Sequence, residues 1–346
     1  MIVEISEWIV GAWYISAPMV VLTVLFAIIM WGVFYQSYKS KSTLEEYKHP
    51  GTLIEVNGRK MHLYFSGQGS QTVVMDSALG SSCLDWSWIQ PKIASVAKVV
   101  TYDRAGYGWS EPSKNPRTSE EIVEELRELL VIARIPPPYI LVGHSFGGLS
   151  MRLFQQKYPD EVSGLVLVDS TPENLFGTLP PDYMKKLSME KRMIKAAKLL
   201  APFGLLRLFK MPMGNLILPE EQKEAARQLG YQTCAYTTAY RELLSMDKSM
   251  QQVSLLKGKQ PLTIPVYVIS RGEFQQGSLT EETILAVNQN WNKLQSEIAH
   301  TSSKHKHLIA NESGHFIHCE KPEMVAELIL TMIKEMEKDL LREDAK

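Results

Sequence analysis

The sequence predicts an α/β protein with a mostly parallel sheet, preceded by one transmembrane helix. Three observations lead to this expectation. Short runs rich in β-branched residues alternate with stretches that have helical hydrophobic spacing, which is the pattern of strands joined by crossover helices. Several of the short runs are apolar throughout, as parallel strands buried on both faces are. Ahead of this pattern, an uncharged segment runs from Trp8 to Tyr38.

The composition excludes several other classes of protein. The chain has 346 residues, of which 45% are hydrophobic, so it has ample material for a core and is not disordered. Cys83, Cys234 and Cys319 are too few and too widely spaced for a disulfide scaffold, and they form no metal-ligand pattern. A formal net charge of −1 gives no indication of a nucleic-acid partner.

The N-terminal segment is long and apolar enough to cross a bilayer, which takes about 20 apolar residues. Its centre, Ala17–Val33, is almost wholly apolar. Aromatic residues, which favour the headgroup zone, flank this centre on both sides; they are Trp8, Trp13, Tyr14, Trp31, Tyr35 and Tyr38. We therefore expect residues 1–38 to form a single-pass anchor that contacts the membrane through residues 9–35. A cleaved signal peptide is disfavoured, because no positive charge precedes the segment and no small-residue cleavage site follows it.

The distribution of lysines predicts the orientation of this anchor. Lys39, Lys41 and Lys48 follow the apolar segment, whereas no Lys or Arg precedes it. Loops rich in Lys and Arg stay on the cytoplasmic side of a membrane. We therefore expect the bulk of the chain, C-terminal to the anchor, to lie in the cytoplasm.

Strand signals begin after a short polar stretch. Residues 39–50 are polar and end at a Pro-Gly pair, which predicts a linker. Asn57-Gly58 between the strand-like runs Leu53–Val56 and Arg59–Phe65 predicts a β-hairpin. The strands expected after this hairpin are Thr72–Met75, Val96–Tyr102, Tyr139–Val142, Leu165–Val168, Val266–Ser270 and His307–Asn311.

Helix starts between these runs are marked by capping signals. The box Thr118–Glu121 predicts a helix through Ala133, and the box Ser278–Glu281 predicts another that runs to about His300. A third helix is expected after Pro322.

One long interval, residues 171–261, contains no convincing strand. It is rich in Met and Leu, and its segment Met193–Leu208 has amphipathic helical spacing. A connection of this length needs its own structure. We interpret it as a helical cap inserted between two parts of one core, residues 51–170 and residues 262–346.

The sequence Gly143-His144-Ser145-Phe146-Gly147 matches the pattern G-x-S-x-G, with a predicted strand before it and a helical run after it. In that context the serine sits on a sharp turn with its hydroxyl exposed, so Ser145 is the predicted nucleophile. A serine hydroxyl needs a base to become nucleophilic. His315, in the loop after the last predicted strand, has the position in the chain that such a base requires.

Two carboxylates could complete a triad in the chain order serine, acid, histidine. Asp169 ends the strand Leu165–Val168, and Glu273 lies in the loop after the next strand. We favour Asp169 and keep Glu273 as the alternative.

Acyl transfer also requires hydrogen-bond donors for the negatively charged oxygen of the intermediate. The backbone N–H of Phe146, directly after the nucleophile, is one expected donor. The loop after the strand Thr72–Met75 should supply the second donor, from Ala78 or alternatively from Leu79.

Together these residues resemble the α/β-hydrolase superfamily, over roughly Gly51 to Leu341. The segment Asp103–Ser110 also resembles the superfamily's D-x-x-G-x-G-x-S turn. The resemblance implies a mostly parallel hydrolase sheet, a cap above the site, and an acyl-enzyme mechanism that uses no metal or organic cofactor. The chain departs from the usual pattern at Asp76-Ser77, where His-Gly is usual, and at Gln275, where the acid is often found.

The serine at the turn narrows the expected reaction. Haloalkane dehalogenases and epoxide hydrolases of this superfamily carry Asp at that position, so they are disfavoured. The resemblance implies a hydrolase of carboxylic esters, and the anchor and Met-rich cap favour lipid or acylglycerol esters over small soluble ones. The alternatives are a peptidase, a carbon–carbon bond hydrolase, and a non-catalytic, membrane-tethered binding protein.

Overall fold

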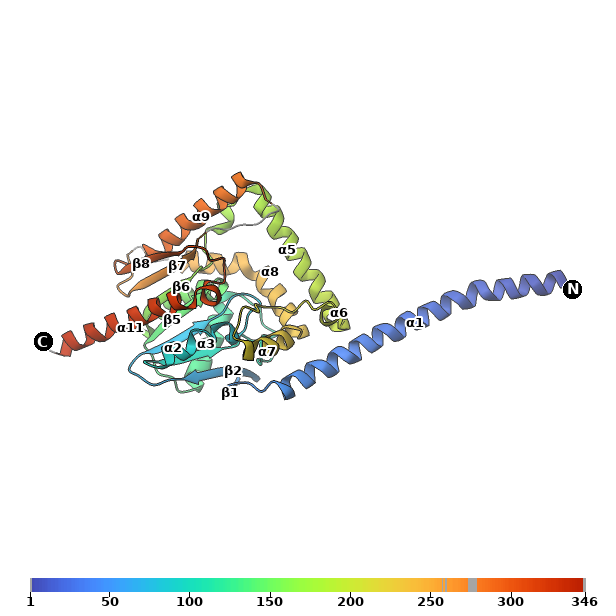
Figure 1. The fold of residues 1–346 in the computed structure, drawn as a ribbon, viewed down its shortest axis with the longest axis horizontal. Helices are drawn as coiled ribbons and strands as arrows, with labels where there is room; N and C mark the ends of the chain where they lie inside the picture. Colours follow the sequence, from blue (N-terminus) through green and yellow to red (C-terminus); the bar gives the residue numbers. More distant parts are fainter. Residues whose placement is uncertain (1, 257, 259, 273–278, 345–346) are drawn as a thin grey trace.

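The computed structural model describes the chain except for residues 1, 257, 259, 273–278 and 345–346 (Figure 1). The described residues form one eight-stranded sheet in the order β1-β2-β4-β3-β5-β6-β7-β8. The first two strands pair antiparallel with each other, as do β2 and β4, and every other neighbouring pair is parallel. The strands are β1 (Thr52–Val56), β2 (Arg59–Ser66), β3 (Thr72–Asp76), β4 (Lys98–Tyr102), β5 (Tyr139–His144), β6 (Val162–Val168), β7 (Val266–Arg271) and β8 (His305–Ala310).

The hairpin of β1 and β2 forms as predicted, with Val56 opposite Arg59. Both residues of the turn have positive φ, 52° at Asn57 and 73° at Gly58. These values are the ones that a two-residue hairpin turn of type I′ requires.

Helices cover both faces of the sheet. Successive strand residues point to opposite faces: Val74 belongs to one core cluster, with residues of α3, α4 and α9, and Val73 belongs to the other, with residues of α2 and α11. The helices outside the long insertion are α2 (Gln90–Ala94), α3 (Ser119–Ile132), α4 (Phe146–Lys157), α9 (Glu281–Ala299), α10 (Ile317–Glu320) and α11 (Pro322–Asp344).

Two predicted helix starts can be compared with the structure. The Oγ1 atom of Thr118 accepts a hydrogen bond from the N–H of Glu121, as the capping box predicted. At α9 the capping side chain is Thr280, which accepts from the N–H of Thr283. Ser278, the first residue of the predicted second box, lies outside the described residues.

The interval between β6 and β7 is helical, as predicted, and no described residue of 171–261 lies in a strand. We call this interval the insertion. A left-handed residue, Gly204 (φ 72°), interrupts the helix expected over Met193–Leu208. The helices of the insertion are the short 3-10 helix η3 (Leu175–Gly177), α5 (Pro181–Leu200), the short 3-10 helix η4 (Ala201–Phe203), α6 (Leu205–Leu208), α7 (Glu220–Gly230) and α8 (Thr233–Leu256).

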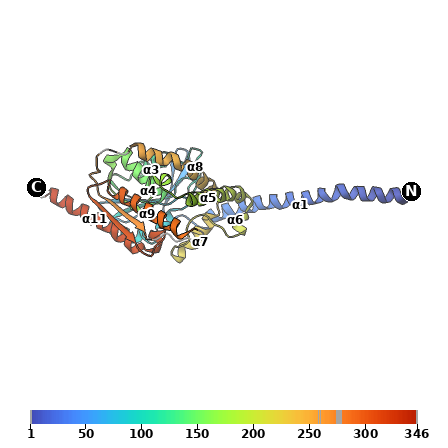
Figure 2. The same cartoon turned by 90° about the horizontal axis from the view of Figure 1, so that it is seen from above.

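The N-terminal helix α1 (Ile2–Glu46) is longer than predicted and projects from the body of the molecule (Figures 1 and 2). Among the described residues it is the one helix long and apolar enough to cross a membrane, and residues 18–31 are exposed along it. The predicted linker of residues 39–50 is wrong for 39–46, which continue the helix. Residues 39–46 include no Gly or Pro, so nothing in them interrupts the helix, which ends at Glu46.

Candidate active site

Ser145 lies on a sharp turn between β5 and α4, at the carboxyl edge of the sheet. Its backbone has φ 54° and ψ −118°, a strained conformation for a residue other than glycine. The turn is tight because α4 starts directly against the loop after β3: a Cβ atom on Gly147 would lie 2.5 Å from the Ser77 carbonyl oxygen. The glycines around the serine are therefore a packing requirement of the turn.

The structure brings Ser145, His315 and Asp169 together from three separate elements. The Nε2 atom of His315 lies 2.9 Å from the Oγ atom of Ser145. On the other side of the ring, Nδ1 lies 2.6 Å from Oδ2 of Asp169. The serine follows β5, the aspartate follows β6 and the histidine lies in the loop after β8, so parallel strands of one half of the sheet deliver all three to one edge.

Asp169 is fully buried and surrounded by donors. Its Oδ1 atom accepts from the indole N–H of Trp291 at 2.7 Å and from the backbone N–H of Arg271 at 3.0 Å. Its Oδ2 atom accepts from Nη1 of Arg271 at 3.0 Å. Burial by itself raises the pKa of this carboxyl, but the Arg271 charge and the contact with His315 outweigh burial and lower the pKa to about 2. The alternative acid, Glu273, lies outside the described residues.

Arg271 and Trp291 are site residues that sequence reasoning missed. Arg271 ends β7, the neighbour of β6 in the sheet, and the parallel register places Ile269 beside Val168. That neighbourhood becomes visible only once the strand order is known. Trp291 comes from α9, and no sequence pattern connects it with Asp169.

His144, next to Ser145, has a contact that positions the loop of His315. Its Nε2–H donates to the backbone carbonyl of His315 at 2.8 Å, and the centroids of the His144 and His315 rings are 4.7 Å apart. Burial, then the nearby His318 and His315, place the pKa of His144 well below its usual value. His144 is therefore neutral, and it adds no positive charge beside His315.

The loop after β3 is held by the buried Arg104. The guanidinium donates to the carbonyls of Ser77 and Ala78, each at 2.6 Å, and to Oδ1 of Asp76 at 2.8 Å. The peptides of this loop are trans, so the N–H of each residue points opposite to the carbonyl of the residue before it. The N–H groups of Ala78 and Leu79 therefore point away from Arg104.

The predicted oxyanion donors share one property. Within the described part of the chain, the N–H groups of Ala78, Leu79 and Phe146 have no hydrogen-bond acceptor. Phe146 is the first residue of α4, where helix N–H groups have no intrahelical partner. Both Ala78 and Leu79 thus remain candidates for the second donor.

The insertion reaches this network through α8. Glu242 accepts from Nε of Arg104 at 3.0 Å and from the hydroxyl of Tyr107 at 2.8 Å. All three side chains are buried. Although burial opposes its charge, the two carboxylates Asp76 and Glu242 raise the pKa of Arg104, which is therefore a buried cation. The insertion thus contacts the loop after β4 and, through Arg104, is linked to the loop after β3, at the sheet edge where Ser145 lies.

One cluster has side chains of the types that bind metals. The ligand atoms of His62, Cys83 and Asp103 lie within 4.8 Å of one another. His62 Nδ1 lies 2.8 Å from Asp103 Oδ2, and the N–H of Cys83 donates to Asp103 Oδ1 at 2.7 Å. Burial places the pKa of the Cys83 thiol well above its usual value, which disfavours the thiolate that a metal needs. These contacts hold the turn after β4 in place, and this structural role accounts for the cluster.

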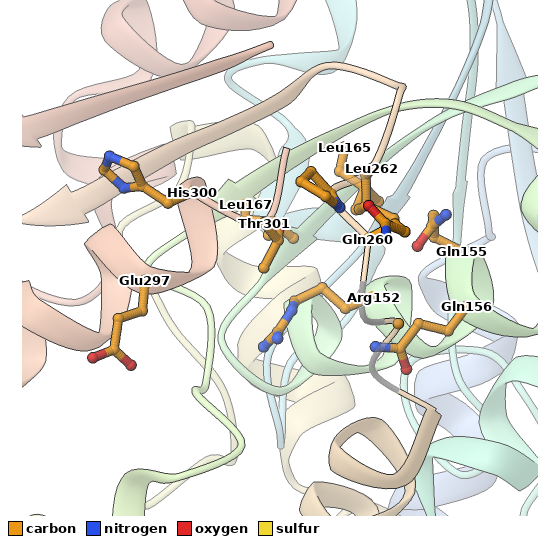
Figure 3. A pocket seen from close by; sticks show the side chains of 12 residues that line it. Arg152, Gln155, Gln156, Leu165, Leu167, Gln260, Leu262, Glu297, His300 and Thr301 are labelled. Atoms are coloured by element: carbon orange, nitrogen blue, oxygen red, sulfur yellow. The ribbon is translucent and has the colours of Figure 1, made fainter. Parts of the chain in front are cut away.

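A cavity of about 420 Å³ lies at the opposite edge of the sheet (Figure 3). Arg152 and Gln156 of α4 line it, together with Leu165 in the middle of β6 and Leu262 before β7. It includes neither Ser145 nor His315. It is therefore separate from the candidate active site.

The sheet order, the strained serine turn and the Ser–His–Asp geometry are those of an α/β hydrolase. The family described as "alpha/beta hydrolase fold" matches residues 72–322, and the chain belongs to this family. The uncharacterized protein YbdG of Bacillus subtilis (strain 168) is 28% identical over 267 residues, which are 74% of this chain and 78% of that protein.

Solved structures show the same fold. The epoxide hydrolase CorEH is 19% identical with a TM-score of 0.62, and the match covers 82% of this chain and 98% of that one. A thermophilic esterase from Thermogutta terrifontis is 18% identical with a TM-score of 0.58, and the match covers 82% and 97%. At these identities the likeness concerns the fold and not the substrate.

Proposed function

We propose that this protein is a membrane-anchored serine hydrolase that cleaves carboxylic esters through Ser145, His315 and Asp169. The observation that carries the proposal is the continuous hydrogen-bonded chain from the Ser145 hydroxyl through the His315 ring to the Asp169 carboxylate. This geometry has a nucleophile, a base within reach of it and a group that orients the base.

The reaction follows from these contacts. His315 Nε2 takes the Ser145 proton as Oγ attacks the ester carbonyl, and the N–H groups of Phe146 and Ala78 stabilise the resulting oxyanion. The protonated His315 then gives its proton to the departing alcohol, which leaves an acyl-serine. Water, deprotonated by His315, attacks this acyl group and releases the acid and the free serine. Asp169 stays ionised and stabilises the imidazolium throughout.

The residue at the turn favours ester cleavage over epoxide opening. CorEH is named as an epoxide hydrolase, and hydrolases of that kind in this superfamily use an aspartate where this chain has Ser145. An acyl-serine intermediate fits esters, with amides and carbon–carbon bonds as the alternatives. The Thermogutta terrifontis neighbour is named as an esterase, in agreement with this choice.

The N-terminal helix supports a lipophilic substrate. Residues 18–31 of its apolar half are exposed, which is stable only if something apolar surrounds them. A bilayer around this half would keep the active site beside lipid and acylglycerol esters. We therefore place the favoured substrate among long-chain acyl esters, ahead of small soluble ones.

Labelling by a fluorophosphonate probe tests the nucleophile. The full chain in detergent should be labelled, Ser145→Ala should lose all labelling, and Ser95→Ala, which removes an exposed serine at the end of α2, should be labelled normally. Absence of labelling in well-folded wild-type protein would refute the hydrolase and favour a binding protein.

Turnover of a series of acyl esters tests the substrate class. Rates should rise from acetyl to long-chain p-nitrophenyl esters and extend to monoacylglycerols. A sharp preference for the shortest chain would refute the lipid assignment while leaving the esterase intact. Faster cleavage of peptide amides or of vinylogous 1,5-diketones would instead indicate a peptidase or a carbon–carbon bond hydrolase.

A further inference from the structure

The C-terminal third of α1 is packed along one side against the insertion. Gly32, Gln36, Ser40 and Thr43 are spaced three or four residues apart and so share one helix face. Gln36 and Thr43 are each 3% exposed, whereas Ser37 and Lys41, on other faces, are exposed. This face is polar or small, in contrast to the apolar half that precedes it.

Specific contacts fix the helix to the insertion. Gln36 Nε2 donates to the Tyr231 carbonyl at 2.7 Å, and Gln232 Nε2 donates to the Ser40 carbonyl at 3.0 Å. At Gly32 the helix touches the backbone of η4: a Cβ atom there would lie 2.5 Å from the Phe203 carbonyl oxygen. The anchor and the insertion therefore form one packed unit. The insertion contacts α1 at a fixed position along the helix axis, which we call its height along α1.

Large apolar side chains are exposed at the corner of the insertion that touches Gly32. We call them the insertion tip; they are Leu199, Phe203, Leu208, Phe209 and Met211. Leu208 is 70% exposed and Phe209 is 65% exposed. Figures 1 and 2 both place α6, which ends at Leu208, at the end of the body where α1 leaves it.

The height of this corner along α1 matches the edge of a bilayer. A helix rises about 1.5 Å per residue, so about 20 residues span a hydrocarbon core of roughly 30 Å. Counting back from Trp31, which is 68% exposed and has a ring suited to the headgroup zone, such a span lies within the apolar half of α1. The contact between Gly32 and Phe203 is one residue beyond Trp31, so the insertion tip lies at the interface.

We propose that the insertion tip inserts into the interfacial layer of the bilayer that α1 crosses, as a second membrane contact; this inference rests on the proposed membrane span of α1. The occupant is lipid because the patch is continuous with a lipid-facing helix and lies at the same depth as its aromatic residues. Lys210, exposed between Phe209 and Met211, can extend its ammonium to the headgroups while the neighbouring side chains enter the layer.

This contact has a consequence for the substrate. The insertion that carries the tip also contacts the loop after β4, because Glu242 accepts a hydrogen bond from Arg104. Arg104 in turn holds the loop after β3. A bilayer-embedded tip would hold the active site at a fixed height above the membrane surface, where long-chain esters are concentrated.

Nitroxide accessibility measures the depth of the tip directly. Leu208→Cys, Leu255→Cys and Phe26→Cys, each in a Cys234→Ser background of the full chain, are spin-labelled and reconstituted in phosphatidylcholine vesicles. Cys83 and Cys319 are buried and remain unlabelled. Leu255 is the matched control, an apolar residue 82% exposed at the far end of α8. Phe26 reports on the apolar half of α1.

The expected result is that labels at 26 and 208 collide more with oxygen than with a water-soluble nickel chelate, and that the label at 255 does the reverse. A label at 208 that behaves like the one at 255, while 26 is lipid-exposed, would overturn the tip proposal alone. A water-exposed label at 26 would overturn both the membrane span and this inference.

In the expected case, Leu208→Asp should lower the rate on vesicle-borne esters several-fold and leave the rate on a soluble acetyl ester unchanged.

Discussion

Several hydrogen-bond donors fix Asp169, the carboxylate that we propose supports Ser145 and His315. Its carboxylate accepts from Trp291 and Arg271, in addition to the contact with His315, so its position does not depend on the histidine. A carboxylate fixed in this way keeps the proton of the neutral imidazole on Nδ1 and leaves Nε2 free to accept the Ser145 proton.

Asp169→Asn tests this role. The amide cannot stabilise the imidazolium and permits the wrong tautomer, so kcat should fall by about 10⁴-fold with little change in KM. Steady-state kinetics on a soluble ester give both constants. Near-normal turnover would transfer the role to another carboxylate, and Glu273→Gln, which we expect to be nearly silent, would then become the test of the alternative.

The same carboxyl makes stability depend on pH. Its pKa is lowered in the folded state from 3.8 to about 2, so its stabilising effect is complete above pH 3.8 and disappears as the pH falls through 2. A shift of this size corresponds to about 2 kcal/mol. Between pH 5 and pH 2 the wild type should lose about that much more unfolding free energy than Asp169→Asn, measured by urea titration. Equal losses in the two proteins would contradict the assigned shift.

Arg104 is expected to position the oxyanion loop without touching the substrate. Arg104→Lys keeps the charge but cannot hold two carbonyls and two carboxylates at once, because an ammonium lacks the planar fork of a guanidinium. We expect kcat and the rate of fluorophosphonate labelling to fall by about 10²-fold with KM nearly constant. Arg127→Lys, which alters a surface pair with Glu161, is the control. A change confined to thermal stability would show that Arg104 is only structural.

At the scale of single elements, α1 shows how one helix can have two environments. Residues 18–31 of its apolar half are exposed, and its C-terminal third packs on the insertion through Gly32 and Gln36. A change of side-chain character along one helix, from apolar all round to small and polar on one face, marks the boundary between them.

Gly32→Ala tests this packing. Alanine is the better helix former by about 1 kcal/mol, but its Cβ would lie 2.5 Å from the Phe203 carbonyl oxygen. Because backbone is in the way, we expect the clash to dominate and the thermal unfolding midpoint in detergent to fall by a few degrees. Ser37→Ala, on an exposed face of the same helix, should change it little. A rise in the midpoint with Gly32→Ala would show that α1 does not pack there.

At the scale of the whole molecule, the charge distribution predicts the side of the membrane on which the hydrolase lies. Lys39, Lys41 and Lys48 follow the apolar segment and none precedes it, so the body should be cytoplasmic. A membrane-impermeant maleimide should label Glu4→Cys in intact cells and Leu255→Cys only after permeabilisation, both in the Cys234→Ser background. The reverse pattern would place the hydrolase outside.

Much of the fold and part of the site could be predicted because their signals are local. The Asn57-Gly58 hairpin, the capping Thr118 and the turn around Ser145 each depend on a few consecutive residues, and the structure has each of them at the predicted position. The length of α1 was also a local matter, since its polar end contains no residue that stops a helix. Polar residues alone do not end a helix when Gly and Pro are absent.

By itself the sequence determined the strand succession, the helical insertion, the apolar helix and the positions of Ser145 and His315, because local spacing and turn chemistry specify them. Only the tertiary structure places the Asp169 carboxylate beside His315, with Arg271 and Trp291 around it, and Arg104 against the Ser77–Ala78 loop. It likewise decided that α1 packs on the insertion. Each of these contacts joins residues far apart in the chain, and their proximity depends on the order of strands in the sheet and on side-chain packing, which no local pattern encodes.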